Sequence, residues 1–252
     1  MKRIVCILGL LLCVLSGCGA KVDRYKAEVV ARYPHERTSY TQGLFFRGSD
    51  LIESTGGFGT SMLRVVDLQT GKASQSVSFK NKYFGEGSVI FGDALYVLTW
   101  TNKLVFVYDP QTLEYRKSFS YPREGWGLTT DGESLIASDG SSRLFFMDGN
   151  LHVTRTVDVK LDGRSVKRLN ELEYIDGRIW ANVYLSDLIV IIDPSDGRVC
   201  ATVDCTGLLP ASLRRPDTDV LNGIAFDSAD GKIYLTGKNW PELYEIKLKP
   251  VK

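Results

Sequence analysis

The sequence predicts an all-β protein, specifically a five-bladed β-propeller. Three observations support this fold: two short sequence patterns that each recur about every 40–45 residues, and the lack of any segment with a clear helical period. Repeats of four antiparallel strands at that spacing are typical of propeller blades. Five repeats of about 45 residues account for most of the 252 residues. A two-sheet sandwich, the alternative, needs fewer strands and leaves the fivefold repeat unexplained.

The clearer pattern is a polar or aromatic residue, then a small or acidic residue, then an apolar strand. It occurs at Gln42-Gly43-Leu44, Glu86-Gly87-Ser88, Trp126-Gly127-Leu128, Asn170-Glu171-Leu172 and Asn222-Gly223-Ile224. In each repeat a glycine-containing turn, which tolerates positive φ, leads to a second apolar strand, at residues 50–53, 94–97, 134–137, 178–181 and 232–235. We expect the first strand of each pair to line the central channel, so that the residues that begin the pattern converge at one end of it.

The second pattern is an apolar strand that ends in aspartate and leads into a tight turn. It occurs at Asp67, Asp109, Asp148, Asp193 and Asp227. Aspartate favours such positions because its side chain accepts hydrogen bonds from the backbone of the turn. The interval before Asp227, 34 residues, is the shortest, so we expect this copy to end a different strand of its repeat.

The N-terminal segment has the features of an export signal. Lys2 and Arg3 precede an apolar run of 13 residues, Ile4 to Ser16, which is too short to span a bilayer. The run ends at Leu15-Ser16-Gly17-Cys18, which looks like a bacterial lipobox. We therefore expect residues 1–17 to be a lipoprotein signal peptide, Cys18 to be lipidated, residues 18–26 to be a tether, and residues 27–252 to form a single propeller domain.

This interpretation predicts an exported bacterial lipoprotein that is anchored to a membrane and faces the periplasm or the exterior. A plain secretory signal with an incidental cysteine is the alternative. Cys6 and Cys13 are removed with the signal peptide. Apart from the lipidated Cys18, the mature chain therefore keeps two cysteines, Cys200 and Cys205. In an oxidising compartment these two can form a local disulfide; otherwise they are two small core residues.

Net charge and the scarcity of histidine exclude several classes of function. A formal net charge of +1 gives no basic surplus for nucleic acid, and we expect no nucleic-acid partner. Two histidines, His35 and His152, argue against most zinc enzymes, whose ligand sets depend on His and Cys. The Asp-rich turns leave room for a structural calcium ion, although no loop has EF-hand spacing.

The residues that begin the repeated pattern differ in chemistry, as a single asymmetric site requires. They include amides, an indole and the carboxylate of Glu86. Aromatic residues expected at the same rim are Tyr40, Trp100, Trp126 and Tyr184. A carboxylate among aromatic walls is desolvated, so its pKa rises toward neutrality, where a general acid–base group works best. Glu86 is therefore the candidate acid–base residue; the alternative is a structural carboxylate that accepts backbone hydrogen bonds.

Several longer strings resemble one known family. They include Tyr40-Thr41-Gln42-Gly43-Leu44, Phe84-Gly85-Glu86-Gly87, Glu124-Gly125-Trp126-Gly127-Leu128, Leu169-Asn170-Glu171-Leu172-Glu173-Tyr174 and Thr236-Gly237-Lys238. Such strings run in the expected order through almost the whole chain after the signal. The chain resembles the plant and bacterial type of glutaminyl-peptide cyclotransferase, a five-bladed propeller unlike the zinc-containing animal enzyme.

The resemblance implies an aminoacyl-type acyltransferase that converts the N-terminal glutamine of peptides and proteins into pyroglutamate and releases ammonia. It implies no required cofactor, no catalytic metal and a monomer. It assigns catalytic roles to Glu86 and Lys238, and substrate binding to Tyr40, Gln42, Trp100, Trp126, Asn170 and Tyr184. Three positions depart from the family pattern: Tyr40 replaces an expected Phe, Tyr184 an expected Trp, and Ser88 an expected Leu.

The reaction itself limits what these residues do. The α-amine must attack the γ-carboxamide carbon, so we expect aromatic walls to orient the glutamine and Glu86 to move protons from the amine to the leaving nitrogen. Candidate donors to the oxyanion are Asn170, Gln42, a Trp N–H and Lys238. Lys238 alternatively holds Glu86 or the substrate in place.

Two other functions are compatible with the sequence. One is a non-catalytic lipoprotein propeller that binds peptides or a partner, because fold alone does not determine chemistry. The other is a glycosidase that pairs Glu171 or Glu173 with Glu53. Glu171 and Glu173 lie two apart on one face of a strand, which is also the arrangement of a structural hydrogen-bonding pair.

Overall fold

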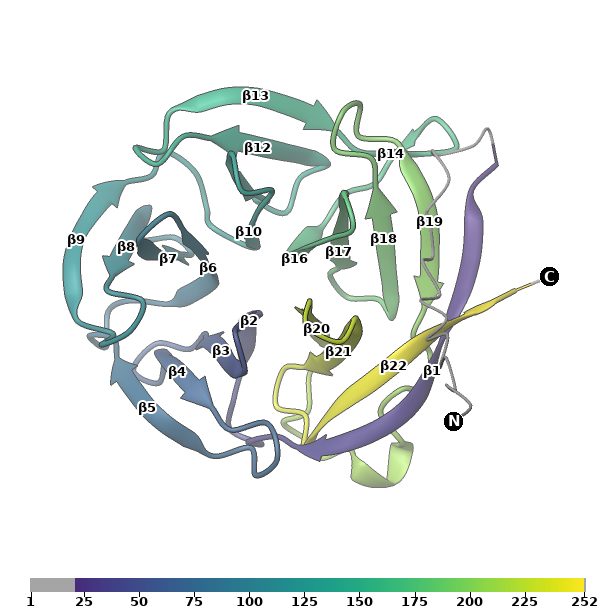
Figure 1. Cartoon of the computed structure of the whole chain (residues 1–252), viewed down its shortest axis with the longest axis horizontal. Coiled ribbons are helices and arrows are strands. Elements are labelled where there is room, and N and C mark those ends of the chain that lie inside the picture. The colour runs from purple at the N-terminus through teal and green to yellow at the C-terminus, as the bar shows by residue number, and fades with distance from the viewer. Residues whose placement is uncertain (1–20, 252) are drawn as a thin grey trace, which may run out of the picture.

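The structure is a computed structural model that describes residues 21–251. It is all-β, and its sheets stand around a central axis in a nearly closed, propeller-like ring (Figure 1). The one helical element in this part of the chain is a 3-10 turn, η1 (Ala211–Leu213). No helix within residues 21–251 is long and apolar enough to span a membrane.

Three of the sheets have four strands each, in sequence order and antiparallel, as the short turns between them require. They are β2 (Thr41–Arg47), β3 (Asp50–Thr55), β4 (Met62–Val66) and β5 (Ala73–Ser78); β6 (Gly85–Phe91), β7 (Ala94–Thr99), β8 (Leu104–Tyr108) and β9 (Tyr115–Ser120); and β10 (Leu128–Thr130), β11 (Leu135–Ala137), β12 (Arg143–Met147) and β13 (Val153–Asp158). A separate small hairpin, β14 (Lys160–Leu161) and β15 (Arg164–Ser165), follows them.

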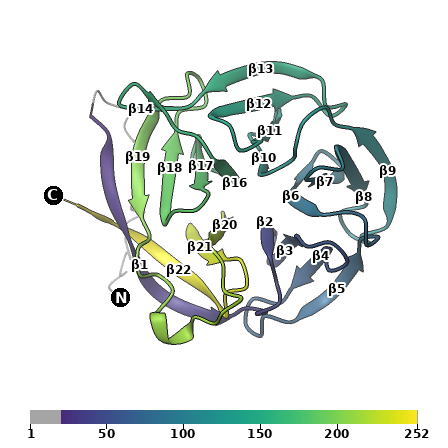
Figure 2. The same ribbon diagram turned by 180° about the vertical axis from the view of Figure 1, so that it is seen from behind.

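The remaining strands form an eight-stranded sheet in the order β16-β17-β18-β19-β1-β22-β21-β20. They are β16 (Leu169–Ile175), β17 (Arg178–Val183), β18 (Leu188–Ile192), β19 (Val199–Asp204), β20 (Leu221–Asp227), β21 (Lys232–Gly237), β22 (Glu242–Pro250) and β1 (Asp23–Pro34). The first and last strands of the described chain, β1 and β22, pair antiparallel and lie side by side in Figures 1 and 2.

The N-terminal boundary of the folded domain lies earlier than expected. Residues Asp23 to Lys26, assigned to the tether from sequence, belong to β1 and pair in parallel with β19. This part of the strand was not recognisable from sequence because its side chains are mostly charged. An outer strand exposes much of its surface and so lacks the apolar face that marks a strand. The lipidation site at Cys18 and the signal peptide at residues 1–17 lie outside the described residues.

The strands nearest the axis are those that begin with the first repeated pattern. β2, β6, β10, β16 and β20 each contact the next and close a ring. Most of their residues are buried, whereas the outer strands β5, β9 and β13 are largely exposed. The expectation that these strands line the centre is confirmed.

The aspartate pattern also has its expected place. Asp67, Asp109, Asp148 and Asp193 each follow the third strand of a repeat, and the Oδ1 atom of each accepts backbone N–H groups of the turn that it begins. Asp227 instead ends β20, an innermost strand, which explains its short interval.

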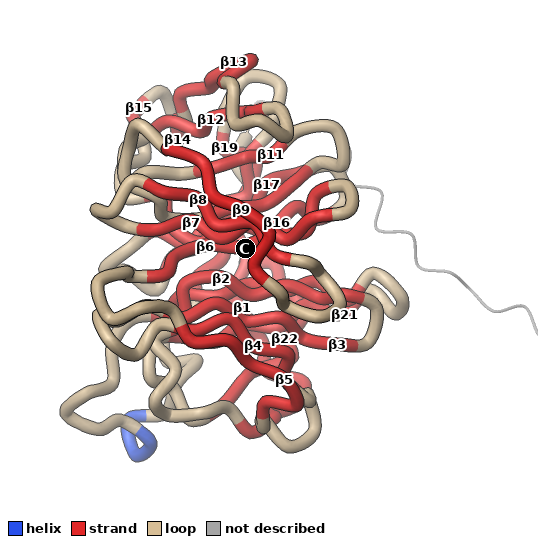
Figure 3. The backbone as a smooth tube through the Cα atoms, turned by 90° about the vertical axis from the view of Figure 1, so that its left-hand side faces the viewer, coloured by secondary structure: helices blue, strands red, loops and turns tan. Residues whose placement is uncertain are grey.

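The apolar core is a ring, because it lies between neighbouring sheets. Phe45 and Val65 of the first sheet, for example, pack with Val97 and Phe106 of the second. Similar clusters occur around the rest of the ring. Seen from the side in Figure 3, strands make up most of the wall and loops gather at the edges. This arrangement leaves the region near the axis to polar residues.

Candidate active site

Irregular strand pairing places the polar residues of the first pattern at the axis. The register between first and second strands shifts from Thr41 to Gly43, from Gly85 to Ser88, from Leu169 to Leu172 and from Leu221 to Ile224. Such bulges bend a strand and redirect the side chains within them, and they are common beside active sites. Gln42, Glu86 and Asn170 thereby come to line one cavity.

The glycines of the pattern let the innermost strands approach one another closely. A Cβ atom on Gly43 would lie 2.6 Å from the backbone nitrogen of Ser88, and one on Gly87 would lie 2.5 Å from that of Leu128. A Cβ atom on Gly127 would collide with the carbonyl oxygen of Asn170. The small residue after each polar one is therefore a requirement of strand packing.

The cavity has a volume of about 210 Å³. An engineered cavity of about 150 Å³ accommodates benzene, so the space suits one side chain with its reacting groups. All eight residues predicted to form the catalytic and substrate-binding set line it: Tyr40, Gln42, Glu86, Trp100, Trp126, Asn170, Tyr184 and Lys238. Their individual roles remain predictions. Asn222, expected at the same end of the channel, does not line it.

Phe84 is a further lining residue that the sequence reasoning did not single out. Its ring packs edge-on against Trp100, with centroids 5.5 Å apart. The signal was present in the string Phe84-Gly85-Glu86-Gly87. A second signal is Gly56, where a Cβ atom would collide with the Phe84 ring, so a glycine there makes room for the aromatic wall.

Glu86 is the buried acidic group of the cavity. It is 4% exposed, and no described residue donates a hydrogen bond to its carboxyl group. Burial raises the pKa of Glu86 well above its usual value; the charge of Glu124 adds to this, and the Lys238 ammonium opposes it. A carboxyl group whose pKa is raised in this way is suited to exchange a proton with a bound ligand.

Lys238 places its ammonium group between two aromatic rings. The Nζ atom lies 4.7 Å from the centroid of the Tyr40 ring and 4.8 Å from that of Tyr184. Burial lowers the pKa of Lys238, whereas the charges of Glu86 and Asp219 oppose this shift. Within residues 21–251 the ammonium forms no ion pair closer than 4.0 Å, so cation–π contacts are its main support.

The hydroxyl of Tyr40 has a partner outside the cavity lining. It donates a hydrogen bond of 2.7 Å to Oδ2 of Asp219, and burial followed by this bond raises the pKa of Tyr40. Sequence reasoning missed Asp219 because it lies 179 residues from Tyr40 along the chain. The hydroxyl that distinguishes Tyr40 from the expected Phe therefore anchors the ring.

The two tryptophans share one acceptor. Trp100 and Trp126 donate their indole N–H groups to Oε2 of Glu124, at 2.9 and 3.2 Å. Both indole N–H groups are thus already bonded, which makes them weaker candidates for donating to the oxyanion than the other donors of the cavity. The contact with Trp126 has a local signal, because Glu124 lies two residues before it and residues two apart on an extended chain lie on one face.

With this geometry established, comparison with known proteins identifies the family. The model of the glutamine cyclotransferase family matches residues 5–248. The chain belongs to this family. The sequence-based resemblance to glutaminyl-peptide cyclotransferases is thus confirmed.

Two family relatives agree with this assignment. A glutaminyl-peptide cyclotransferase of Arabidopsis thaliana is 45% identical over 229 residues, which are 88% of this chain and 71% of the relative. The crystal structure of the glutaminyl cyclase of Myxococcus xanthus has a TM-score of 0.86 and 35% identity, and the match covers 92% of this chain and 100% of that one. The WD40 β-propeller domain of Doa1, at 12% identity and a TM-score of 0.50 over 81% of this chain and 62% of that one, shares the fold alone.

Two amide side chains of this cyclotransferase-family chain complete the polar lining. Oε1 of Gln42 accepts a hydrogen bond of 3.1 Å from Asn222, which fixes the amide so that its NH2 group is the end left for a ligand. Oδ1 of Asn170 is buried and has no hydrogen-bond partner among the described residues. An unpaired buried acceptor beside a cavity is costly, and a bound ligand that donates a hydrogen bond would remove that cost.

The carboxylates considered for glycosidase chemistry have structural roles. Glu171 accepts hydrogen bonds from the backbone of Leu44 at 3.3 Å and of Ile224 at 2.9 Å, which link β16 to β2 and β20. Glu173 accepts one from Phe226 at 3.1 Å, and burial raises its pKa to about 8. Neither lines the cavity, so the carboxylate pair that a glycosidase needs is not formed there.

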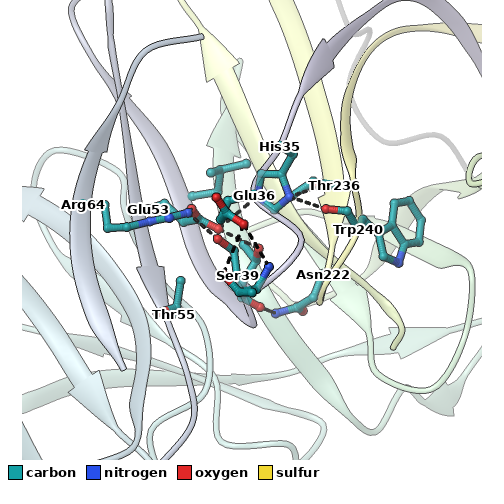
Figure 4. A network of polar contacts seen from close by, with 12 residues as sticks. His35, Glu36, Ser39, Glu53, Thr55, Arg64, Asn222, Thr236 and Trp240 are labelled. Carbon is teal, nitrogen blue, oxygen red and sulfur yellow. Dashed lines mark hydrogen bonds and ion pairs between the residues drawn. The ribbon is translucent and has the colours of Figure 1, made fainter. Parts of the chain in front are cut away.

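Glu53, the third of these carboxylates, lies at the centre of a buried polar network (Figure 4). It forms an ion pair with Arg64 and accepts hydrogen bonds from Thr41 at 2.7 Å and from Nε2 of His35 at 3.1 Å. Nδ1 of His35 lies 2.7 Å from the carbonyl oxygen of Trp240. The network thus connects the start of β2, which carries Gln42, to the turn that carries Lys238.

The described chain contains one free cysteine. Cys205 is free and buried, and burial raises the pKa of its thiol. No Cys200–Cys205 disulfide is formed, so the core-residue alternative holds for Cys205. Among residues 21–251 no group of three or more His, Cys, Asp or Glu side chains is placed to hold a metal ion.

Proposed function

We propose that the cavity binds the N-terminal glutamine of a peptide and that Glu86 transfers the protons of its cyclisation. The chain is a glutaminyl-peptide cyclotransferase, which forms pyroglutamate and releases ammonia. The observation that supports the role of Glu86 most directly is its position: a buried carboxyl group, without hydrogen bonds from described residues, in an aromatic cavity about one side chain in size.

The aromatic walls orient the substrate. Trp100 and Trp126 are fixed at their N–H groups by Glu124, and Trp126 also packs edge-on against Tyr184 with centroids 5.5 Å apart. Rigid walls favour the compact glutamine rotamer in which the α-amine faces the γ-carboxamide carbon. Holding reacting groups in such geometry removes part of the entropic barrier.

Glu86 then carries one proton through the reaction. The amine loses a proton as its nitrogen bonds to the carboxamide carbon, and the carboxyl group of Glu86 takes it up. The same proton passes to the departing nitrogen, so that the C–N bond breaks with ammonia and not the amide anion as the leaving group. A carboxyl group with a raised pKa suits both transfers.

Lys238 is our choice for stabilising the oxyanion that forms at the carboxamide carbon. Its ammonium lines the cavity and has no ion-pair partner in the described chain, so its charge is available to a ligand. The NH2 groups of Gln42 and Asn170 are the additional donors. Because both indole N–H groups are bonded to Glu124, they have no part in this step.

Incubating the purified protein with a peptide that begins with glutamine tests the function. We expect the peptide to lose the mass of one ammonia while ammonia appears in solution. A matched peptide that begins with asparagine should remain unchanged, because its shorter side chain would close a four-membered ring. We further propose that catalysis needs no metal, in which case activity survives exhaustive chelation. Retention of the intact mass of the glutamine peptide by the folded protein would favour the binding-only alternative.

We also propose that the ring contains five blades. The eight-stranded sheet would then count as two, β16–β19 and β20–β22 with β1, joined where β19 meets β1. The closed ring of the innermost strands supports this count.

The lipoprotein signal at residues 1–17, lipidation of Cys18, export to the cell envelope and a monomeric state are further proposals that rest on the sequence alone. Metabolic labelling with a tagged fatty acid in the wild-type protein and in Cys18→Ala tests the anchor. Light scattering during size-exclusion chromatography tests the monomer.

A further inference from the structure

A second hollow adjoins the cavity and shares two of its walls, Tyr40 and Phe84. Its volume is about 540 Å³. One side is the turn at residues 56–61 between β3 and β4 together with Met62 at the start of β4, and the other is the segment at residues 37–39 ahead of β2. We call this hollow the Phe84 groove.

We propose that the Phe84 groove binds the residues that follow the N-terminal glutamine, and that Arg37 there binds a carboxylate of the second or third residue. This inference rests on the proposed function and names the class of peptide that the site prefers. The carboxylate belongs either to an acidic side chain or to the C-terminus of a short peptide.

The size of the catalytic cavity requires such a neighbouring site. A space of about 210 Å³ holds the glutamine side chain and its amine, but the glutamine carbonyl continues into the peptide and must leave the cavity. The groove is the hollow that continues from the cavity across Tyr40 and Phe84. A peptide leaving over these two rings enters it directly.

The turn on one side of the groove is shaped for close contact with a chain. Gly57 has φ of +115° and Gly59 has φ of +82°, conformations that residues with a Cβ atom rarely adopt. Between them Phe58 is 56% exposed, and its ring packs edge-on against Phe84 with centroids 5.4 Å apart. An exposed phenylalanine supported by a cavity wall offers apolar surface to a substrate residue.

Arg37 supplies the available charge in the groove. Its guanidinium donates one hydrogen bond of 3.1 Å, to the carbonyl oxygen of Leu213. It forms no ion pair within the described chain, although Asp217 also lines the groove. The second arginine of the lining, Arg64, is already paired with Glu53. A guanidinium has five N–H donors in a planar fork that suits a carboxylate, so most of the donors of Arg37 remain for a ligand.

The test compares kcat/KM for glutamine amide, Gln-Ala-NH2, Gln-Glu-NH2, Gln-Lys-NH2 and Gln-Ala with a free C-terminus. For the wild-type protein we expect Gln-Glu-NH2 to exceed Gln-Lys-NH2 about five-fold or more, because binding energy away from the reacting atoms also contributes to kcat/KM. A preference for free Gln-Ala over Gln-Ala-NH2 would assign the carboxylate to the C-terminus, and a preference for Gln-Glu-NH2 over Gln-Ala-NH2 to the side chain.

Arg37→Ala should abolish the acidic preference, Arg37→Lys should keep part of it, and Arg37→Glu should reverse it. The matched control is Arg168→Ala, which removes another exposed arginine, on the Tyr184 side of the cavity, where its charge lowers the pKa of Tyr184. The preference should persist in that variant. Its loss in Arg168→Ala with retention in Arg37→Ala would overturn the proposal.

A variant that fills the groove tests the binding of the peptide chain independently of charge. Thr60→Trp should reduce the ratio of kcat/KM for Gln-Ala-NH2 to that for glutamine amide, whereas Gln111→Trp, on an exposed remote turn, should not. An unchanged ratio in Thr60→Trp would refute the groove while the cyclisation of glutamine amide still supports the proposed function. Failure of the wild-type protein to cyclise any of these substrates would refute the function itself.

Discussion

Tyr40 donates its hydroxyl hydrogen to Asp219 over 2.7 Å, and this bond joins one wall of the cavity to the segment that leads into β20. The backbone nitrogen of Asp219 donates in turn to the carbonyl oxygen of Lys238 at 3.0 Å. The ring of Tyr40 and the backbone of Lys238, whose ammonium lies against that ring, are therefore bonded to the same residue. A substitution that removes the hydroxyl should loosen this contact without removing the aromatic wall.

We expect Tyr40→Phe to retain most of kcat and to raise KM by a few-fold, because the loss of one hydrogen bond of about 1 kcal/mol leaves the ring in place but less firmly held. Steady-state kinetics with a glutamine peptide measures both constants. Tyr96→Phe is the control, since the Tyr96 hydroxyl also donates one hydrogen bond, to Gly149 at 3.0 Å, away from the cavity. A collapse of kcat in Tyr40→Phe would mean that the hydroxyl itself takes part in the chemistry.

Glu86→Gln should fold normally and lose nearly all turnover, because an amide cannot carry the proton from the amine to the leaving nitrogen. Measuring kcat together with the circular dichroism spectrum separates the two effects. Glu28→Gln, at a half-exposed carboxylate on β1 away from the cavity, should keep full activity. Substantial turnover by Glu86→Gln would remove the proton-transfer role from this residue.

The same variant should change how stability depends on pH. The folded state raises the pKa of Glu86, so it binds the proton more tightly than the unfolded chain does. Between the unfolded and folded pKa values the stability of the wild-type protein must therefore fall as pH rises. Glu86→Gln lacks this contribution, and its melting temperature should exceed that of the wild type more at about pH 8 than at about pH 4. If the difference in melting temperature between Glu86→Gln and the wild type became smaller as pH rises, the raised pKa of Glu86 would be contradicted.

Glu124→Ala should raise KM and lower kcat together, by roughly ten-fold in kcat/KM, because both indoles lose their shared acceptor and the walls no longer hold one geometry. Steady-state kinetics on the purified variant provides the measurement. Glu114→Ala, at an exposed carboxylate in a remote turn, should leave both constants unchanged. If Glu124→Ala behaved like Glu114→Ala, the fixation of the indoles would have no catalytic value.

Gly127→Ala should destabilise the protein by about 1–3 kcal/mol, since the new methyl group meets the carbonyl oxygen of Asn170 and forces two innermost strands apart. Chemical denaturation measures this loss. Gly149→Ala is the matched control, because there a Cβ atom is no closer than 3.5 Å to its neighbours. If the two variants were equally stable, the innermost strands could move apart at little cost to accommodate the methyl group.

Glu53→Gln should cost about 3 kcal/mol or more at neutral pH, because it leaves the buried guanidinium of Arg64 without its partner. Burial alone would raise the pKa of Glu53, but His35 and Arg64 outweigh it and lower the pKa to about 2. Stability from this carboxylate is present above its unfolded pKa and is lost as pH falls toward about 2.

The wild type and Glu53→Gln should therefore converge in stability in strong acid, which acid-dependent denaturation curves would reveal. Asp50→Asn, whose carboxylate forms an ion pair with Arg47 and is 48% exposed, should cost far less. A constant difference between wild type and Glu53→Gln at every pH would contradict the lowered pKa.

The repeat could be predicted from sequence because each innermost strand is built from the same few local rules. Wherever strands approach closely at the axis, the sequence repeats a polar residue, a small residue and an apolar run. At Gly127, for example, any larger residue would collide with the carbonyl oxygen of Asn170. The same register predicted that Gln42, Glu86, Trp126 and Asn170 converge at the axis, whereas the full lining set came from the family resemblance. Strand β1 could not be predicted so well, because its partners β19 and β22 lie at the far end of the chain.

The partners of the cavity residues were harder to predict than the residues themselves. Asp219 and Tyr40 meet only through tertiary folding, and no local pattern marks the pair. Glu124 was visible beside Trp126, but its second contact, with Trp100, spans 24 residues and two sheets. Sequence therefore indicated which side chains face the cavity, whereas the direction of each hydrogen bond required the structure.

The pairing of β1 with β22 has a consequence for biogenesis. In a nascent chain that has reached only β21, the earlier sheets can form one by one. Strand β1, however, still lacks its antiparallel partner β22. Lys238 arrives in the same late portion of the polypeptide, just ahead of that closing strand. If Lys238 acts as proposed, the newly made chain should stay inactive until β22 has docked against β1, and deletion of β22 should abolish activity while sparing the three four-stranded sheets.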